Sequence, residues 1–327
     1  MEVIEMDALL ALLRAVAHTG YRFKSITPLS HSYVNARPGN EWARPHSQAG
    51  GVGQGLRDIF GWSRPFRQDA VPAEIFYLMK RANILEKFQD GWRSKVRISS
   101  LDEVLYLHSP YPTTDEHSVF FGPDTYRYVQ HIQHTLSVRD AVVNRAADIG
   151  SGAGPGAITM ALHYPSAEVF ALDINTAALE LTAANAATAG ADNVVPLYSD
   201  LLSGVPGKFD LITANPPYLV DRDQRAYRHG GGALGADLSL AIIDAAIPRL
   251  SPGGTLLLYT GVAIVDGTDL FRIAAEERVA ASGLSALLTV SYLEIDPDIF
   301  GEELLNACYA STDRIAAVLL KITLSNQ

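Results

Sequence analysis

The stretch ITANPPYLV, residues 212–220, carries side chains that could do chemistry on a planar nitrogen. Proline lacks a ladder N–H and favours extended geometry in the residue before it, so a strand must end at Asn215. The two prolines hold the Asn215 side-chain oxygen and the Pro216 carbonyl as fixed acceptors for two N–H bonds. Tyr218 can stack on the planar group and face a developing positive charge. We predict Asn215, Pro216 and Tyr218 as catalytic residues and Pro217 as substrate-binding.

A second motif, DIGSGAGPGAI at residues 148–158, lies between a predicted strand and a predicted helix. A glycine-rich turn lets a ligand approach the backbone at a helix N-terminus. Gly150, Gly152 and Gly154 have the spacing G-x-G-x-G. The dinucleotide fingerprint G-x-G-x-x-G would require glycine where Pro155 stands, which argues against a dinucleotide-dependent oxidoreductase.

Acidic residues follow the next two predicted strands. Asp173 ends one of them and can accept two ribose hydroxyls through its carboxylate oxygens. Asp200 follows the other strand in YSDLL. Its alternative role is that of a helix N-cap for the turn behind it.

These motifs together resemble the class I S-adenosylmethionine-dependent methyltransferases over residues 117–324. Asp148 through Gly154 match the family's first motif, D/E-x-G-x-G-x-G, and NPPY after the fourth strand is similar to the catalytic motif of amino methyltransferases. The resemblance implies S-adenosyl-L-methionine as cofactor and S-adenosyl-L-homocysteine as product. It places Asp173 at the ribose, Asp200 at the adenine amine and Asp148 at the methionine end. The implied cofactor-binding residues are Asp148, Gly150, Gly152, Gly154, Asp173, Ile174, Asp200, Leu201 and Asn215.

The stretch HSVFFGPDTYRYVQHI, residues 117–132, loosely resembles segments that precede the cofactor domain in HemK-type glutamine methyltransferases and small-domain RNA guanine methyltransferases. We predict Phe121 and Thr125 as substrate-binding residues on this basis. The alternative is a turn in which Asp124 caps the next helix. The segment lacks the Arg and Glu of the HemK pattern, which counts against a release-factor substrate.

The glycine-rich segment GGGALGADL keeps the glycines and Asp237 of a HemK-like stretch. It suggests a mobile lid over the substrate. The candidate lid extends over residues 221–237 and carries three arginines, Arg222, Arg225 and Arg228. They face either an acidic substrate or solvent.

From residue 141 onward, apolar strand patterns alternate with helical ones. This alternation predicts a doubly wound, mostly parallel, seven-stranded α/β sheet of the Rossmann-like methyltransferase type. The last two strands lack a crossover helix and should pair antiparallel. Strands are expected at residues 142–149, 168–174, 193–199, 209–215, 254–261, 286–295 and 314–324, and helices at 157–165, 176–190, 238–250 and 269–282.

Residues 1–112 lack the alternation of strand and helix patterns seen after residue 141. Helical patterns cover residues 7–18 and 73–88, a Gly- and Pro-rich loop covers 35–55, and a hairpin covers 95–108. We predict a helical or winged-helix-like substrate-recognition domain over residues 1–112 and the methyltransferase domain over residues 113–327.

Composition limits the class of protein. The 327 residues are 48% hydrophobic and 19% charged, with a net charge of −10. Cys308 is the single cysteine, so no disulfide framework or Cys-based zinc cluster is expected. No signal peptide or apolar run of membrane-spanning length is evident, and we expect a cytoplasmic protein without a membrane partner.

Two smaller features were weighed for function. Residues 37–97 carry 11 basic against 6 acidic side chains, which fits a docking face for RNA or an ordinary mixed surface. His131 and His134 share a helix face but have no third ligand, so no metal is predicted.

The sequence therefore predicts an N-methyltransferase whose acceptor is a planar NH2 group of protein glutamine or of an RNA base. One alternative is a small-molecule N- or O-methyltransferase on the same scaffold. Another is a catalytically idle, cofactor-binding partner subunit.

Overall fold

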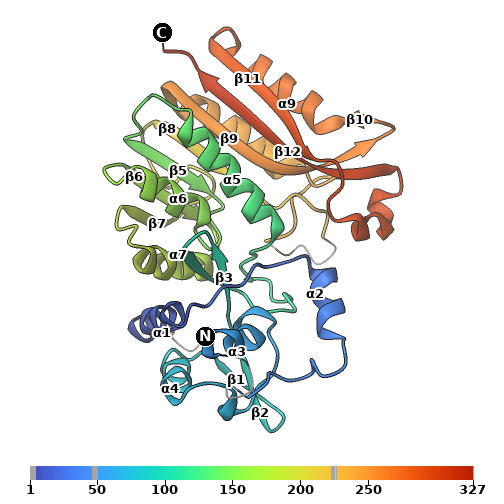
Figure 1. The fold of residues 1–327 in the computed structure, drawn as a ribbon. Helices are drawn as coiled ribbons and strands as arrows, with labels where there is room; N and C mark the ends of the chain where they lie inside the picture. The colour runs from blue at the N-terminus through green and yellow to red at the C-terminus, as the bar shows by residue number, and fades with distance from the viewer. Residues whose placement is uncertain (1–4, 46–50, 222–224, 226, 327) are drawn as a thin grey trace.

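The computed structural model describes residues 5–326 except 46–50, 222–224 and 226. A twisted sheet in the C-terminal two-thirds of the chain organises the molecule (Figure 1). Its strands are β5 (Arg145–Ile149), β6 (Glu168–Asp173), β7 (Val194–Tyr198), β8 (Phe209–Ala214), β9 (Leu250–Val265), β11 (Leu288–Asp296) and β12 (Thr312–Leu324). A short strand β10 (Thr268–Asp269) turns back on β9.

The order of the strands is β7-β6-β5-β8-β9-β12-β11. The first five are parallel, and β12 runs antiparallel to both β9 and β11. The predicted seven-stranded, mostly parallel sheet and its antiparallel last pair are therefore confirmed. The order reverses between β5 and β8, and the carboxyl ends of parallel strands at such a reversal form a ligand-binding crevice.

Helices cover both faces of the sheet, as parallel strands require. One face carries α5 (Pro123–Ser137), α6 (Pro155–His163) and α7 (Thr176–Ala189), and the other carries α8 (Asp237–Ala246) and α9 (Leu270–Ala281). Neighbouring strand residues supply the two cores alternately: Ala146 packs on the first face and Ala147 on the second. Short 3-10 turns lie at η4 (Ile247–Arg249), η5 (Ser285–Leu287), η6 (Gly301–Leu305) and η7 (Ala307–Tyr309).

The N-terminal region, residues 5–108, combines short helices with two hairpins. It contains α1 (Met6–His18), α2 (Pro28–Asn35), α3 (Val52–Leu56), the π-turn η2 (Arg57–Gly61), the 3-10 turn η3 (Gln68–Ala70), α4 (Ala73–Arg81) and the strands β1 (Leu85–Phe88), β2 (Gly91–Ser94), β3 (Arg97–Leu101) and β4 (Val104–His108). β1 pairs with β2 and β3 with β4.

The helix expected over residues 73–88 is wrong in its second half. It ends at Arg81 because Asn83 takes a left-handed conformation (φ 56°), and residues 85–88 then pair as a strand. Asparagine is one of the few residues that tolerate this region, so Asn83 was the available signal. The hairpin expected at 95–108 is present, with Asp102 (φ 50°) in its turn.

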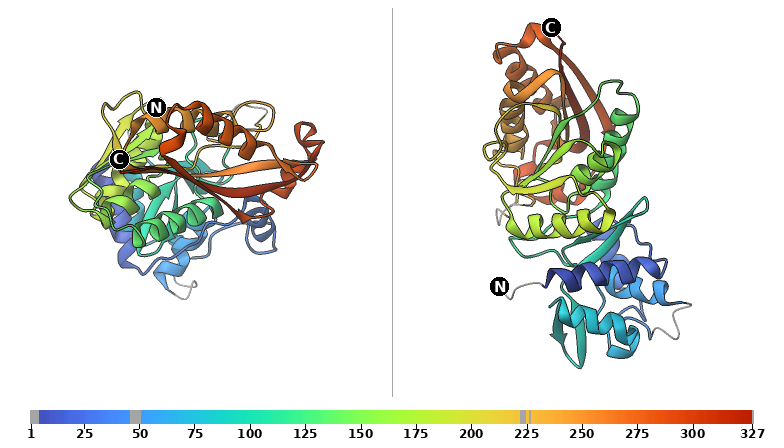
Figure 2. Two further views of the ribbon diagram at one scale, coloured as in Figure 1. Left: turned by 90° about the horizontal axis from the view of Figure 1, so that it is seen from above. Right: turned by 90° about the vertical axis from the view of Figure 1, so that its left-hand side faces the viewer.

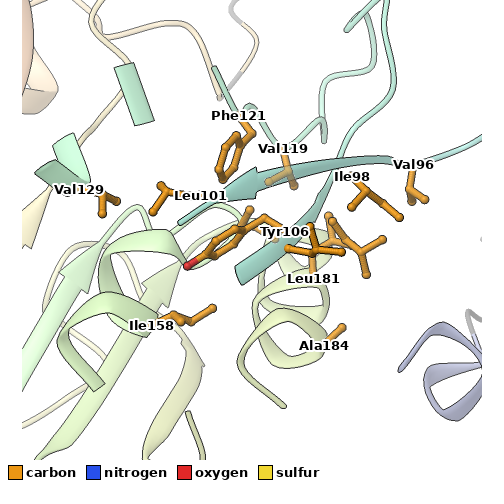
Figure 3. Close-up of a cluster of buried hydrophobic side chains, with 14 of the residues drawn as sticks. Val96, Ile98, Leu101, Tyr106, Val119, Phe121, Val129, Ile158, Leu181 and Ala184 are labelled. Atoms are coloured by element: carbon orange, nitrogen blue, oxygen red, sulfur yellow. The ribbon is translucent and has the colours of Figure 1, made fainter. Parts of the chain in front are cut away.

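One hydrophobic core continues from the N-terminal region into the α7 side of the sheet. The helix α7 lies next to the N-terminal region (Figure 2, right). Figure 3 shows Ile98 and Tyr106 of the β3–β4 hairpin beside Leu181 and Ala184 of α7. A division of the chain near residue 112 therefore remains a prediction.

Asn185 of α7 joins the two parts through polar contacts. Its Oδ1 accepts from Leu107 N at 2.8 Å, and its Nδ2 donates to Leu107 O at 3.1 Å and to Ala153 O at 2.9 Å. This fully buried amide completes the open edge of β4 and also holds the glycine loop.

Candidate active site

A cavity of about 220 Å³ lies at the carboxyl ends of β5, β6, β7 and β8. The structure brings most of the predicted site residues to its wall. These are Thr125, Asp148, Gly150, Gly152, Asp173, Ile174, Asp200, Leu201, Asn215, Pro216, Pro217 and Tyr218. Gly154 and Phe121 lie outside this wall.

The glycine loop turns sharply between β5 and α6. Gly150 and Gly152 adopt positive φ values of 67° and 57°, which few residues with a side chain tolerate. Gly154 is the N-cap of α6 with φ 84°, and a Cβ there would lie 2.8 Å from the Thr182 methyl carbon. Gly154 therefore shapes the turn, whereas Gly150 and Gly152 face the cavity.

Asp148 is buried at the end of β5 and is held by three donors. Its Oδ1 accepts from the Tyr128 hydroxyl at 2.5 Å and the Thr213 hydroxyl at 3.0 Å, and its Oδ2 accepts from Ala157 N at 2.9 Å. Burial raises the pKa of this carboxyl to about 6, while the three hydrogen bonds oppose the rise. Asp148 thus links the sheet to the first turn of α6.

Asp173, at the end of β6, orients the same loop from the other side. Its Oδ2 accepts from Gly152 N and its Oδ1 from Asn175 N, both at 2.9 Å. Burial raises the pKa of its carboxyl, and the backbone donors work against that rise. Each carboxylate oxygen has a second lone pair, so the group can also receive ligand hydroxyls.

The end of β7 closes the cavity beyond Asp173. The Ser199 hydroxyl donates to Leu201 O at 2.8 Å and accepts from Gly204 N at 2.9 Å, which holds Leu201 in a positive φ of 51°. Asp200 is exposed at this turn. Ile174 is 53% exposed beside Asp173, so an apolar surface lies next to polar acceptors, as a nucleoside requires.

Asn215 follows β8 directly at the wall of the cavity. In the part of the chain that the structure describes, no hydrogen bond engages its side-chain amide, so the oxygen can accept from a ligand. Pro216 is buried and Pro217 is half-buried. The rigid turn thus presents a free acceptor beside the glycine loop.

Tyr218 is fixed more tightly than its neighbours. Its ring lies over the backbone of Gly261 on β9, where any Cβ would overlap it, and meets the Phe300 ring edge-on at 6.1 Å. Burial, together with the adjacent Asp124 carboxylate, raises the pKa of its hydroxyl well above the usual value. Tyr218 is therefore a neutral phenol at the cavity wall.

Sequence reasoning missed a buried polar network beneath the NPPY turn. The Asp124 carboxylate accepts from the Tyr259 hydroxyl at 2.6 Å and from Arg127 at 3.1 Å, and Arg127 also pairs with Asp296 at 2.7 Å. Tyr128 is four residues after Asp124, so helical spacing puts both on the face of α5 that meets the site. That spacing was the available signal.

The segment before α5 departs from expectation at two residues. Phe120 lines the cavity, whereas the Phe121 ring is buried against Tyr106 and stacks on His108 at 5.2 Å (Figure 3). Adjacent side chains in an extended segment point to opposite sides, so only one of the two can face the site. Gly122, rather than Asp124, is the N-cap of α5, and its N–H donates to the Thr125 hydroxyl at 3.3 Å.

The glycine-rich segment packs against the NPPY backbone. Gly230 N donates to Leu219 O at 2.8 Å, and a Cβ at Gly235 would overlap the Tyr218 carbonyl. Residues 230–235 therefore form a support for the turn. The lid expected here also included residues 222–224 and 226, which lie outside the described residues.

Two of the predicted arginines have partners in the chain itself. Arg225 pairs with Asp221 at 2.5 Å, and Arg228 pairs with Glu303. Arg222 lies outside the described residues. The charges of Arg225 and Arg228 are therefore neutralised locally.

Four of the 11 basic residues of the 37–97 segment form ion pairs with other described residues. Arg44 and Arg64 share Asp58, and Arg67 pairs with Asp90 at 2.7 Å. Among the described residues, no group of three or more His, Cys, Asp and Glu side chains could hold a metal ion. No helix of the described ranges is long and apolar enough to cross a membrane.

The chain is similar to several known proteins. Residues 128–263 match the family model described as methyltransferase small domain. The ribosomal protein uL3 glutamine methyltransferase of Neisseria meningitidis is 37% identical over 133 residues, 37% of this chain and 44% of the relative. The release factor glutamine methyltransferase of Deinococcus radiodurans is 36% identical over 201 residues, 58% of this chain and 66% of the relative. The crystal structure of wild-type Trm5b from Pyrococcus abyssi, at 17% identity, matches 78% of this chain and 71% of its own with a TM-score of 0.48.

Fold, glycine loop and family model together define a class I methyltransferase domain. The chain is similar to the HemK-like group of the S-adenosylmethionine-dependent methyltransferases, whose cofactor is S-adenosylmethionine. The match spans less than half of the uL3 relative's length. The residues present fit this cofactor. Asp173 has carboxylate lone pairs that no described residue uses, the backbone of the glycine loop lines the cavity, and Ile174 provides an apolar surface beside them.

Proposed function

We propose that the protein methylates the side-chain amide nitrogen of a glutamine in a protein substrate, using S-adenosylmethionine as donor. The observation that carries the proposal is the free Asn215 amide at the end of β8, in the same cavity as the glycine loop. The names of two relatives support the choice of acceptor, since both are glutamine methyltransferases.

The bound cofactor would supply an electrophilic methyl group on a sulfonium. The residues of the chain must then orient a poorly nucleophilic nitrogen. The Asn215 oxygen and the Pro216 carbonyl accept the two N–H bonds of the amide and turn its lone pair toward the methyl group. Tyr218, held by Gly261 and Phe300, packs against the amide plane. Transfer would form the C–N bond and break the methyl–sulfur bond, which leaves the donor as the neutral thioether S-adenosylhomocysteine. The nitrogen, then cationic, would lose a proton to water.

On the cofactor side, we assign Asp173 to the ribose hydroxyls, Asp200 to the adenine amine, and Gly150 and Gly152 to the backbone contact. Asp148 takes an indirect role, because its oxygens are engaged by Tyr128, Thr213 and Ala157. It positions the loop and the start of α6.

A protein acceptor is favoured over RNA by the ion pairs of the N-terminal region. Nucleic-acid affinity depends on basic side chains that are free to displace counterions. Among the described residues, Arg44, Arg64, Arg67 and Arg81 pair with acidic residues of the same chain, so four of the 11 basic side chains of the 37–97 segment are less available to phosphates.

The test is a labelling reaction with radioactive S-adenosylmethionine and three acceptors, namely purified uL3, a purified release factor and total RNA. We expect label in one protein, and peptide mass spectrometry should locate it on a glutamine side chain. Asn215→Ala serves as control and should lose labelling while retaining S-adenosylhomocysteine binding by calorimetry. Label in the RNA alone would contradict the proposal.

A further inference from the structure

A second, smaller cavity lies beside the active site. Its volume is about 20 Å³, and it is enclosed between α2, the β3–β4 hairpin and the segment that precedes α5. Arg97, His31, His108 and Tyr111 line it. Val119 and Phe120 separate it from the larger cavity, since they line both.

Arg97 is a buried cation without a carboxylate partner in the described residues. Its side chain is about 95% buried, since only 5% of the residue is exposed. Nε donates to the Gly61 carbonyl at 3.0 Å, while Nη2 is buried and has no hydrogen-bond partner among the described residues. The guanidinium carbon also lies 5.7 Å from the centroid of the Phe23 ring. Neither a carbonyl nor a ring face carries a full negative charge, so the guanidinium has no counter-charge in the described part of the chain, which is costly in a protein interior.

His31 presents the second unpartnered atom. Its Nε2 lies 3.0 Å from the Trp62 carbonyl, which can only accept, so Nε2 carries the proton. Nδ1 is buried and has no partner among the described residues. The ring can donate from Nδ1 only as an imidazolium, and burial together with the Arg97 charge lowers its pKa to about 4. At neutral pH His31 therefore offers no donor to an anion, and Arg97 is the group that must hold it.

The charged groups nearby add no compensating acid. Arg64 acts on His31 with a further positive charge, and its own partner Asp58 is shared with Arg44. The Arg97 charge also lowers the pKa of His108, whose Nε2 is taken by the Ser99 hydroxyl at 2.8 Å. The surroundings of the cavity therefore carry an excess of positive charge.

We propose that this cavity is a binding site for one monovalent anion of chloride size. The volume exceeds the ~15 Å³ that a single water requires, so the cavity can hold one small species. The anion accepts from Arg97 Nη2 and supplies the missing negative charge at the junction of α2, the β3–β4 hairpin and the Val119–Phe120 wall.

The test is thermal unfolding of the full chain, without cofactor, at constant ionic strength. Sodium chloride or bromide replaces sodium gluconate, whose anion is too large for the cavity. We expect the Tm to rise by about 3 °C once the halide exceeds its Kd tenfold, because only the folded state binds it. Arg97→Gln should abolish this dependence. Arg67→Gln, which removes an exposed arginine paired with Asp90, should retain it.

A second measurement does not require a variant. Crystals grown in bromide should show an anomalous peak within hydrogen-bond distance of Arg97 Nη2. Equal Tm values in halide and gluconate would overturn the proposal, because the cavity would then hold only water. The absence of a bromide peak at Arg97 would overturn it as well.

Discussion

Two sides of the active-site cavity differ in how their polar groups are used. On the loop side, which comprises Gly150–Gly154, Asp148 and Asp173, both carboxylates accept hydrogen bonds from the chain itself. On the proline side, Asn215–Tyr218, the described residues leave the Asn215 amide without a partner, and packing holds the turn. The loop side is therefore shaped by polar contacts, whereas the proline side keeps its acceptor for a ligand.

Asn215→Ala should have the largest effect, because it removes the free acceptor of the proline side. We expect kcat to fall by about 10²-fold or more, since the lost hydrogen bond acts in the transition state. S-adenosylhomocysteine affinity, measured by calorimetry, should change little. Asn215→Asp keeps an oxygen acceptor and should retain more activity. Equal kcat in wild type and Asn215→Ala would remove Asn215 from the chemistry.

Asp148 should make stability depend on pH. Its pKa rises from 3.8 to about 6 on folding, so the folded state holds this proton more tightly than the unfolded chain does. The stabilisation is complete below pH 4 and is lost as pH rises through 6, by about 3 kcal/mol. Urea unfolding of wild type and Asp148→Asn across this range isolates the contribution. Parallel pH profiles of the two proteins would show that the pKa of Asp148 does not change on folding.

Asp173→Ala should weaken cofactor binding by about 30-fold. The substitution removes the charged acceptor proposed for the ribose hydroxyls and also the hydrogen bond that holds Gly152 N. The kcat at saturating cofactor should change far less. Asp192→Ala, which removes an exposed acid before β7, is the matched control. A loss in kcat without a loss in affinity would move Asp173 out of the cofactor-binding role.

Gly261→Ala should displace Tyr218 on the proline side through a steric clash, without removing any polar group. The new methyl would overlap the Tyr218 ring and cost about 2 kcal/mol of unfolding free energy, measured in urea. Gly301→Ala is the control, because the nearest atom to its Cβ, an Asp298 oxygen, is 3.6 Å away. If both variants unfold alike, Tyr218 does not depend on Gly261.

The sheet could be predicted from the sequence because short local patterns mark where each strand and helix begins and ends. Apolar runs, the Gly190 helix end and the NPPY strand end all act over a few residues. The same holds for Asp173 and Asn215, since carboxyl ends of parallel strands meet at one edge.

The remainder depends on contacts distant in sequence. Asp124 meets Tyr259 across 135 residues, and no local pattern predicts such a pair. The choice between Phe120 and Phe121 depends on which side of an extended segment faces the core. Residues 85–88 are helix-compatible in composition, but Asn83 and the pairing with β2 make them a strand.

The buried amide of Asn185 ties together two pieces of backbone that would otherwise be independent. A truncation that removed the β3–β4 hairpin would take away the Leu107 partners of Asn185 and, through Ala153, loosen the turn expected to cradle the donor. The N-terminal region and the donor-binding part should therefore be kept together in any engineered version of the chain.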